Sequence, residues 1–353
     1  MDHHVARHRF CDFGQYQDQL RHFWDIDATQ ISAGPLSLEL DWLDAGDVVL
    51  SRLKFDRAAA LRCMGRPGWH SLVMHGSPKR WCGIDLPADA LLTIPPGLET
   101  CVLSREPWES ITVLVRCETL ASWEPPFAGL GDLPSSPGRS ILAVDPVAVR
   151  RYRAWVRTVF EAAPRTCLHD GEASWPVAIR DLLKERLRDV LGLKSDIKPL
   201  SPLGRVARYD LALAALRMVQ RSTDRRLTVG DLSRGLGVTE RTLQYVFIRV
   251  IGVSPAQYIL ADRLNRARQQ LIQEGRSGGT VTAVAYDHQF ENLSRFALQY
   301  ARLFGERPSD TLNGARETDP HVQDSRSCRT SVRSSGSVAG GLAADISDGG
   351  PGA

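Results

Sequence analysis

Short apolar runs alternate with turn residues over the first third of the chain, from about residue 37 to residue 116. The apolar runs are SLELDWL, DVVLSRLKF, HSLVMHG, ALLTIPPG and ESITVLVR, and the segments between them contain DAGD, GRPG, GSPK and PPG. Turn signals at a spacing of about 8–12 residues are typical of strands that pair in antiparallel order. This pattern predicts an antiparallel β sandwich or a small β barrel.

Helical periodicity replaces this pattern in the middle of the chain. Apolar residues recur at intervals of three and four over residues 147–160, 175–191 and about 203–220, whereas the last residues contain few large apolar side chains. We therefore divide the chain into an N-terminal segment (1–35), a β domain (36–140), a helical linker region (141–200), an all-α domain (203–316) and a disordered tail (317–353).

Residues 227–252, LTVGDLSRGLGVTERTLQYVFIRVIG, predict two short helices joined by a tight turn. Gly237 supplies the left-handed backbone conformation that such a turn requires, and Thr239 is a suitable N-cap for the second helix. The spacing of Leu243 and Phe247 places them on the buried face of that helix. This is a helix-turn-helix pattern, in which the second helix can enter the major groove of DNA with its N-terminal turns leading.

The same pattern repeats in residues 280–304, where Asn292 is placed to cap the helix LSRFALQYARLF. The two units also end alike, in VIGVSPAQYI and LFGERPSDTL. Residues 255–274 between them predict one continuous helix of roughly 30 Å. This length is close to the ~34 Å helical turn of B-DNA, so one chain could place two recognition helices in successive major grooves.

The formal net charge of +3 conceals an uneven distribution. Residues 203–316 contain 17 Arg, no Lys and 10 acidic residues, which gives this segment a net charge of +7, whereas residues 1–202 carry a net charge of −2. Because the basic segment coincides with the two helix-turn-helix units, we expect a nucleic-acid partner there.

The seven cysteines are scattered and none lies in a CxxC pair, so we expect free thiols in a reducing compartment. The first residues lack the apolar run of a secretory signal. No stretch approaches the ~20 apolar residues that cross a bilayer. We therefore expect a cytoplasmic protein with no membrane partner.

Two segments of the chain resemble the DNA-binding domain of the AraC-type transcriptional regulators. They are RLTVGDLSRGLGVTERTLQYVFIRVIGVSPAQYILADRLNRARQQL and VTAVAYDHQFENLSRFALQYARLFGERPSDTL. The resemblance covers about residues 205–315. It implies an α+β two-domain fold, with a cupin-like antiparallel β barrel and following helices before an all-α tandem helix-turn-helix domain. It also implies a transcription regulator, and an activator in particular, that binds double-stranded promoter DNA, responds to a small-molecule effector, forms a homodimer and contacts RNA polymerase. No cofactor and no enzymatic activity are implied.

The resemblance also assigns the DNA contacts to particular residues of the two recognition helices. Arg241 and Arg295 are the expected guanine readers, because a guanidinium can bond both O6 and N7 of guanine. Tyr245 could instead pack on its own helix. The residues assigned by the resemblance are Arg241, Gln244, Tyr245, Leu293, Ser294, Arg295 and Gln299. The helical spacing adds Glu240, Arg249 and Arg302, which should lie on the same outward faces, and phosphate contact is the expected role of the two arginines.

Three positions of the second unit differ from the family's usual pattern. Gln289 stands in the turn where the family usually has Gly, which predicts a mildly strained backbone. Leu298 and Ala301 stand where Arg and Lys are common. We therefore expect the second unit to bind DNA less tightly or less specifically than the first.

Candidate effector-binding residues in the β domain are Trp42, His70, Met74 and Trp108, although simple core packing explains them equally well. His70 and His75 should face opposite sides of one strand, which argues against a shared metal ion. Two other function classes remain open. One is a cupin-type metal oxygenase with an appended DNA-binding domain, which needs two or three histidines and a carboxylate at one site. The other is a DNA-bending protein without sequence preference.

Overall fold

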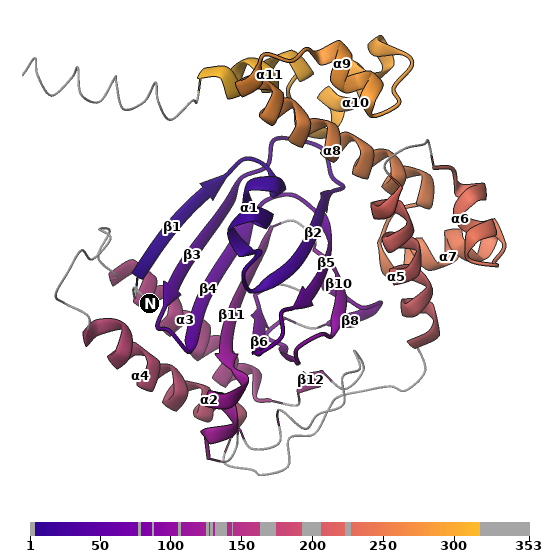
Figure 1. Cartoon of the computed structure of the whole chain (residues 1–353). Coiled ribbons are helices and arrows are strands. Elements are labelled where there is room, and N and C mark those ends of the chain that lie inside the picture. Colours follow the sequence, from indigo (N-terminus) through magenta and orange to yellow (C-terminus); the bar gives the residue numbers. More distant parts are fainter. Residues whose placement is uncertain are drawn as a thin grey trace, which may run out of the picture.

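The computed structural model describes residues 4–76, 79–86, 88–104, 107–124, 127, 130, 140–142, 144–162, 174–192, 206–222 and 227–317. These residues form an N-terminal β domain with covering helices and an all-α C-terminal region (Figure 1). The predicted α+β fold class is therefore confirmed. Apart from its first residue, the predicted tail at 317–353 lies outside the described residues.

Two antiparallel sheets build the β domain. The larger sheet has the strand order β1-β3-β4-β11-β6-β9-β12 and the smaller one the order β2-β5-β10-β7-β8. The strands of the larger sheet are β1 (His4–Phe10), β3 (Leu38–Asp44), β4 (Val48–Phe55), β6 (Trp69–His75), β9 (Leu91–Ile94), β11 (Trp108–Arg116) and β12 (Ile141–Leu142). Those of the smaller sheet are β2 (Trp24–Gln30), β5 (Ala59–Gly65), β7 (Lys79–Trp81), β8 (Ile84–Leu86) and β10 (Glu99–Leu103).

The β domain begins earlier than the predicted boundary at residue 36. Strand β1 pairs with β3 and β2 pairs with β5, and helix α1 (Phe13–Leu20) connects them. Residues 4–30 therefore belong to the β domain rather than to a separate N-terminal segment. Both strands lie at sheet edges and carry polar residues (HVARHRF and WDIDATQ), so their apolar pattern is weak.

Side chains along each strand alternate between two hydrophobic cores. On β4, Val49 and Leu53 pack in the interior between the sheets, whereas Val48 and Leu50 pack on the opposite face. That opposite face is covered by helices from the middle of the chain (Figure 1). These helices are α2 (Cys117–Ser122), α3 (Pro146–Ala162) and α4 (Ser174–Leu191).

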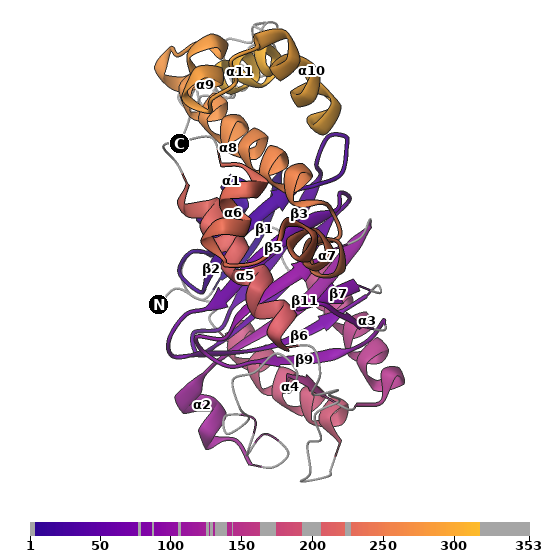
Figure 2. The same cartoon turned by 90° about the vertical axis from the view of Figure 1, so that its right-hand side faces the viewer.

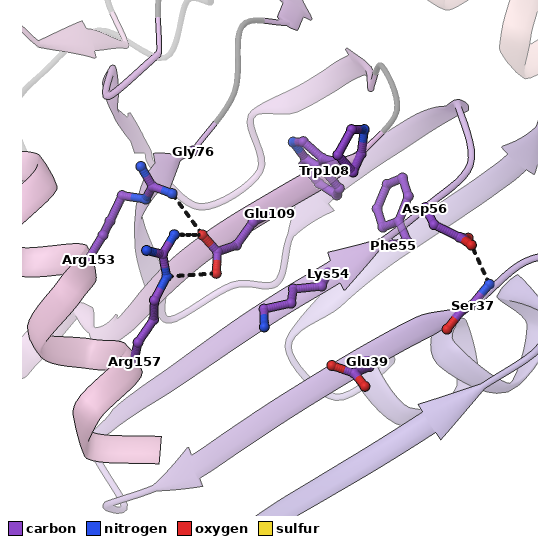
Figure 3. Close-up of a pocket in the computed structure, with 11 residues that line it drawn as sticks. Ser37, Glu39, Lys54, Phe55, Asp56, Gly76, Trp108, Glu109, Arg153 and Arg157 are labelled. Atoms are coloured by element: carbon purple, nitrogen blue, oxygen red, sulfur yellow. Dashed lines mark hydrogen bonds and ion pairs between the residues drawn. The ribbon is translucent and has the colours of Figure 1, made fainter. Parts of the chain in front are cut away.

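A cluster of ion pairs fastens α3 to the larger sheet (Figure 3). The carboxylate of Glu109 on β11 accepts hydrogen bonds from Arg157 and, at 2.7 Å, from Arg153. Burial alone would raise the pKa of Glu109, but the hydrogen bonds from these two guanidinium groups lower it to about 2. The cluster borders an open groove of about 400 Å³, in which Lys54 and Glu39 also lie. Arg153 and Arg157 of α3 are therefore already paired with a carboxylate.

The helices of the C-terminal region divide into two groups joined by α8 (Figure 1). The first group packs beside the β domain, and the second lies at the far end of α8. The helices are α5 (Val206–Arg221), α6 (Val229–Gly235), α7 (Glu240–Val250), α8 (Pro255–Ser277), α9 (Val281–Asp287), α10 (Leu293–Phe304) and α11 (Pro308–Glu317).

The β domain and the first helical group share one hydrophobic core. Leu213 of α5, Phe247 of α7 and Tyr258 of α8 are buried in the same cluster as the interior side chains of both sheets. The second helical group has a separate core that includes Phe296 and Tyr300. Figure 2 shows α5 and α7 against the strands, with α9, α10 and α11 extending beyond them. The first group is therefore packed into the β domain, whereas the second group has its own interior.

A buried polar cluster lies where α8 meets β2. The hydroxyl groups of Tyr258 and Thr29 are 3.4 Å apart, and Arg266 pairs with Asp262 at 3.0 Å. Burial raises the pKa of Asp262 to about 7, with Arg266 opposing the rise and Asp27 on β2 adding to it. Burial also raises the pKa of Asp27. The contact between the domains therefore holds two carboxyl groups whose pKa is raised by burial.

Replacement of Asp262 tests the effect of this burial on stability. Asp262 holds its proton more tightly in the folded chain than at its ordinary pKa of 3.8, so its burial lowers stability progressively as the pH rises from about 4 to about 7. We expect Asp262→Asn to gain stability relative to the wild type over that interval, because an amide has no charge to desolvate. Urea unfolding of both proteins across this pH range measures the difference, and a difference that is the same at every pH would contradict the expectation.

Candidate nucleic-acid interface and interior cavity

The first helix-turn-helix unit consists of α6 and α7. Thr228 and Asp231 form a capping box at the start of α6, and Gly237 has the left-handed conformation in the turn, with φ of +65°. The Thr239 hydroxyl then accepts a hydrogen bond from the Thr242 backbone at 3.1 Å and caps α7. These local features are the ones that the sequence predicted.

The outward face of α7 carries every DNA-contact residue assigned to the first unit. Glu240, Arg241, Gln244, Tyr245 and Arg249 are all exposed, whereas Leu243, Val246, Phe247 and Val250 are buried. The Tyr245 ring is 43% exposed, and the guanidinium groups of Arg208 and Arg249 lie 5.2 and 5.6 Å from its centre. Tyr245 therefore has a defined place on its own helix and an accessible edge.

The second unit consists of α9 and α10 and has the same construction. Thr280 caps α9, and the side chain of Asn292 accepts a hydrogen bond from the Arg295 backbone at 2.8 Å to cap α10. Gln289 occupies the turn with φ of +60°, where the first unit has Gly237. The strained backbone predicted for Gln289 is therefore present.

The outward face of α10 carries exposed leucine side chains beside its polar residues. Leu293, Ser294, Arg295 and Arg302 are exposed and Gln299 is half-buried. Leu298, at 67% exposed, is the most exposed of the large apolar side chains in the described part of the chain. A large apolar side chain in this position offers no charge to a phosphate, which agrees with weaker DNA contact by the second unit.

Helix α8 sets the separation of the two units. Its 23 residues correspond to roughly 34 Å at 1.5 Å per residue. It begins with a capping box between Ser254 and Gln257, and Pro255 follows at the first turn. One rigid element of about one DNA turn in length therefore joins the two recognition helices.

Part of the positive charge of this segment is used inside the protein. Arg266 pairs with Asp262 and donates a hydrogen bond to the Val219 carbonyl at 2.9 Å. Arg268 is buried and pairs with Glu306 at 2.7 Å. Because Asp262 and Glu306 belong to the same segment, these pairs leave its net charge of +7 unchanged, but they reduce the number of its 17 arginines that are available to DNA.

Arg263 faces a groove between the two units. Its guanidinium lies 4.1 Å from the centre of the Phe290 ring. The groove has a volume of about 430 Å³ and is also lined by Thr228, Arg295 and Gln299. It therefore runs from the start of α6 to the start of α10, between the two surfaces assigned to DNA.

The β domain holds both recognition helices at their C-terminal ends. Arg80 on β7 donates hydrogen bonds to the carbonyl groups of Ile248 and Arg249, at 3.3 and 2.8 Å (Figure 2 shows β7 beside α7). Gly34 and the Gln30 side chain donate to the Leu303 carbonyl near the end of α10, at 2.9 and 3.0 Å. Carbonyls at a helix C-terminus lack partners within the helix, so such donors anchor the helix. The N-terminal turns remain free.

The interior cavity contains two of the four candidate effector residues. Trp42 and Trp108 line the space between the sheets. His70 and Met74 do not, since Met74 packs under the covering helices and the His70 ring lies 2.6 Å from the Thr93 hydroxyl. Burial lowers the pKa of His70 to about 4. The side chains of β6 that face the cavity are Val73 and His75, which the sequence analysis did not select.

A metal-oxygenase site receives no support. Among the described residues, no three His, Cys, Asp or Glu side chains converge as metal ligands. His70 and His75 face opposite sides of β6, as predicted. No helix in the described part of the chain is long and apolar enough to cross a membrane.

Comparison with known proteins places residues 232–314 in a family described as a helix-turn-helix domain. The chain is 34% identical over 86 residues to a probable thc operon regulatory protein of Rhodococcus erythropolis, covering 24% of this chain and 26% of that protein. It is 31% identical over 98 residues to the XylDLEGF operon transcriptional activator 2 of Pseudomonas putida, covering 28% and 62%. The matches thus span about a quarter to three-fifths of these relatives.

A solved structure is also similar in sequence. It is that of a probable AraC family transcriptional regulator from Rhodopseudomonas palustris CGA009, which is 32% identical, with 30% of this chain and 97% of that chain covered and a TM-score of 0.28.

The left-handed residue in the second turn provides a test of local strain. We expect Gln289→Gly to raise the free energy of unfolding by roughly 0.5–1 kcal/mol, because glycine adopts positive φ without a steric penalty. Gly237→Ala in the first unit is the matched opposite change, and we expect it to lower stability by about 1 kcal/mol or more. Urea unfolding measures both, and a loss of stability in Gln289→Gly would contradict the assignment of strain to this turn.

Proposed function

We propose that the protein is a sequence-specific DNA-binding transcription regulator of the AraC type, since residues 232–314 match a helix-turn-helix family and the chain is similar in sequence to a probable AraC family regulator. In this proposal α7 and α10 enter successive major grooves of double-stranded promoter DNA. The resemblance to transcriptional activators supports activation as the direction of regulation. The proposed partner places the protein in the cytoplasm, the compartment that holds bacterial DNA.

One observation carries the proposal. Two capped recognition helices lie at the two ends of a helix about one DNA turn long, and the N-terminal turns of both are exposed. A helix that enters a major groove contacts base edges with these turns. The exposed arginines Arg241 and Arg295 occupy them. The contacts that anchor both helices to the β domain lie at the opposite, C-terminal ends.

The β domain is the proposed regulatory part of the chain. Its two sheets enclose a cavity, which supports a cupin-like domain that binds a small-molecule effector. The helices α3 and α4 expose Val147 and Leu182, at 41% and 43%, and we assign homodimer formation to this helical region. Contact with RNA polymerase completes the proposal for an activator.

Arginine substitutions on the recognition helices test the proposal. A DNA site is first selected by the purified full-length protein from a pool of random duplexes. We expect Arg241→Ala and Arg295→Ala each to lose about 1–3 kcal/mol of binding to that site, because each removes a bidentate contact to guanine. Titration at fixed salt concentration measures the loss.

Arg21→Ala is the matched control, since Arg21 is an exposed arginine at the end of α1 in the β domain and its loss changes the net charge equally. We expect this variant to bind the selected site as the wild type does. Failure to enrich any site from the pool would contradict sequence-specific binding and favour a DNA-bending protein instead.

The exposed Leu298 side chain on α10 leads to a prediction of tighter DNA binding, the opposite of the loss expected for the arginine variants. We expect Leu298→Arg to bind DNA more tightly than the wild type and to steepen the dependence of log K on log salt by about 0.9, the value for one added phosphate contact. Gln19→Arg on α1 adds the same charge at an exposed position of the β domain, away from both helix-turn-helix units, and should leave DNA binding unchanged. Equal affinities for wild type and Leu298→Arg would show that α10 does not face DNA.

A further inference from the structure

The cavity inside the β domain has a lining that restricts what can bind there. Its volume is about 70 Å³, several times the roughly 10–15 Å³ that one water molecule requires on this measure. The indole rings of Trp24, Trp42, Trp81 and Trp108 line it, together with Leu, Ile and Val side chains. The lining also includes hydroxyl-bearing residues, which are Tyr16, Ser51, Thr100, Ser110 and Thr112. An enclosed space with flat aromatic walls favours a small ligand with a planar apolar body.

Two buried polar side chains in the wall have no hydrogen-bond partner. His75 on β6 is 2% exposed with both ring nitrogens unbonded, and Trp81 on β7 is 0% exposed with its Nε1–H unbonded. The His75 ring is stacked on that of Trp108 at 5.8 Å between centres, which fixes its position. Buried polar groups in native proteins are almost always satisfied. A ligand that supplies these missing partners therefore fits the site.

The charge of the lining narrows the class of ligand. No Asp, Glu, Lys or Arg is among the described residues that line the cavity. A phosphate or carboxylate would enter without a countercharge, and the desolvation of such a group is unfavourable. A neutral hydroxyl avoids this penalty. It can accept a hydrogen bond from the Trp81 N–H and donate one to an unprotonated nitrogen of His75.

We propose that this cavity binds a small, uncharged aromatic molecule that carries one or two hydroxyl groups, and that this molecule is the effector. Its role as effector rests on the proposed regulatory function, whereas its binding does not. Trp81 is adjacent on β7 to Arg80, whose guanidinium anchors α7 through the Ile248 and Arg249 carbonyl groups. A ligand on Trp81 is therefore one residue away from the anchor of the first recognition helix.

A panel of four compounds tests the class of ligand on the full-length wild-type protein. Phenol and catechol carry the hydroxyl groups, toluene lacks them and benzoate adds a charge. Quenching of tryptophan fluorescence gives Kd, and a raised unfolding temperature gives an independent measure of binding to the folded state. We expect phenol or catechol to bind at least about tenfold more tightly than toluene or benzoate. Binding by none of the four at millimolar concentration, or equal binding by toluene or benzoate, would overturn the proposal.

Two variants test the roles of Trp81 and His75 without removing their aromatic rings from the cavity wall. Trp81→Phe and His75→Phe keep an aromatic ring and remove the polar atoms, so we expect about tenfold weaker phenol binding with toluene binding unchanged. Trp123→Phe is the matched control, because Trp123 is a buried tryptophan that packs on Phe127 under the covering helices. Equal phenol binding by the wild type and both cavity variants would overturn the assignment.

DNA selection with the same preparations separates this inference from the proposed function. A protein that selects a defined DNA site but binds neither phenol nor catechol overturns the inference and leaves the proposed function intact. A protein that binds phenol through Trp81 and His75 but selects no DNA site supports the assignment of the cavity and overturns the proposed function. A shift in DNA affinity on saturation with phenol supports both.

Discussion

The apolar contact between α5, α7 and the two sheets determines the arrangement of everything else in this chain. Leu213 and Phe247 are as deeply buried as the side chains within the sheets, so the first recognition helix is packed as an internal element of the β domain on one side. Hydrophobic burial of this extent is non-directional. The orientation of the helices is therefore set by directional polar contacts. Arg80 donates a hydrogen bond to a carbonyl group at the end of α7, and the Asn265 side chain donates one to the Gln30 carbonyl.

On α7 and α10 these polar contacts involve the C-terminal ends, so the outward-facing N-terminal turns of both helices stay accessible. The anchored carbonyl groups belong to the last turns of α7 and α10, where unpaired acceptors are available. The side chains of the first turns remain in solvent. The second unit is held less extensively, because its core is separate and its main link to the β domain is the bonding of Gln30 and Gly34 to Leu303. The anchoring contacts and the proposed DNA contacts thus lie at opposite ends of the same helices.

Features that depend on neighbouring residues were predictable from the sequence. The caps Thr239 and Asn292 follow from local backbone chemistry, and the left-handed Gln289 follows from the resemblance to a family that usually has Gly in this turn. The face of β6 that lines the cavity was not predictable, because every residue of that strand is buried and its pattern has no polar side. The internal partners of Arg266 and Arg268 were also not predictable from the sequence. Arg266 contacts the backbone of α5, and Arg268 contacts Cys11 and Glu306, which are far from it in the sequence.

The shared core has a consequence for how such a protein can change over evolutionary time. Recombination that joins this DNA-binding region to a different sensor would expose Tyr209, Leu213 and Phe247 to water unless the new sensor offered a matching surface. Module exchange is therefore a poor route to new behaviour for this lineage. Adaptation to a new signal is expected to proceed through point substitutions in the cavity wall, with the join between the two domains inherited unchanged.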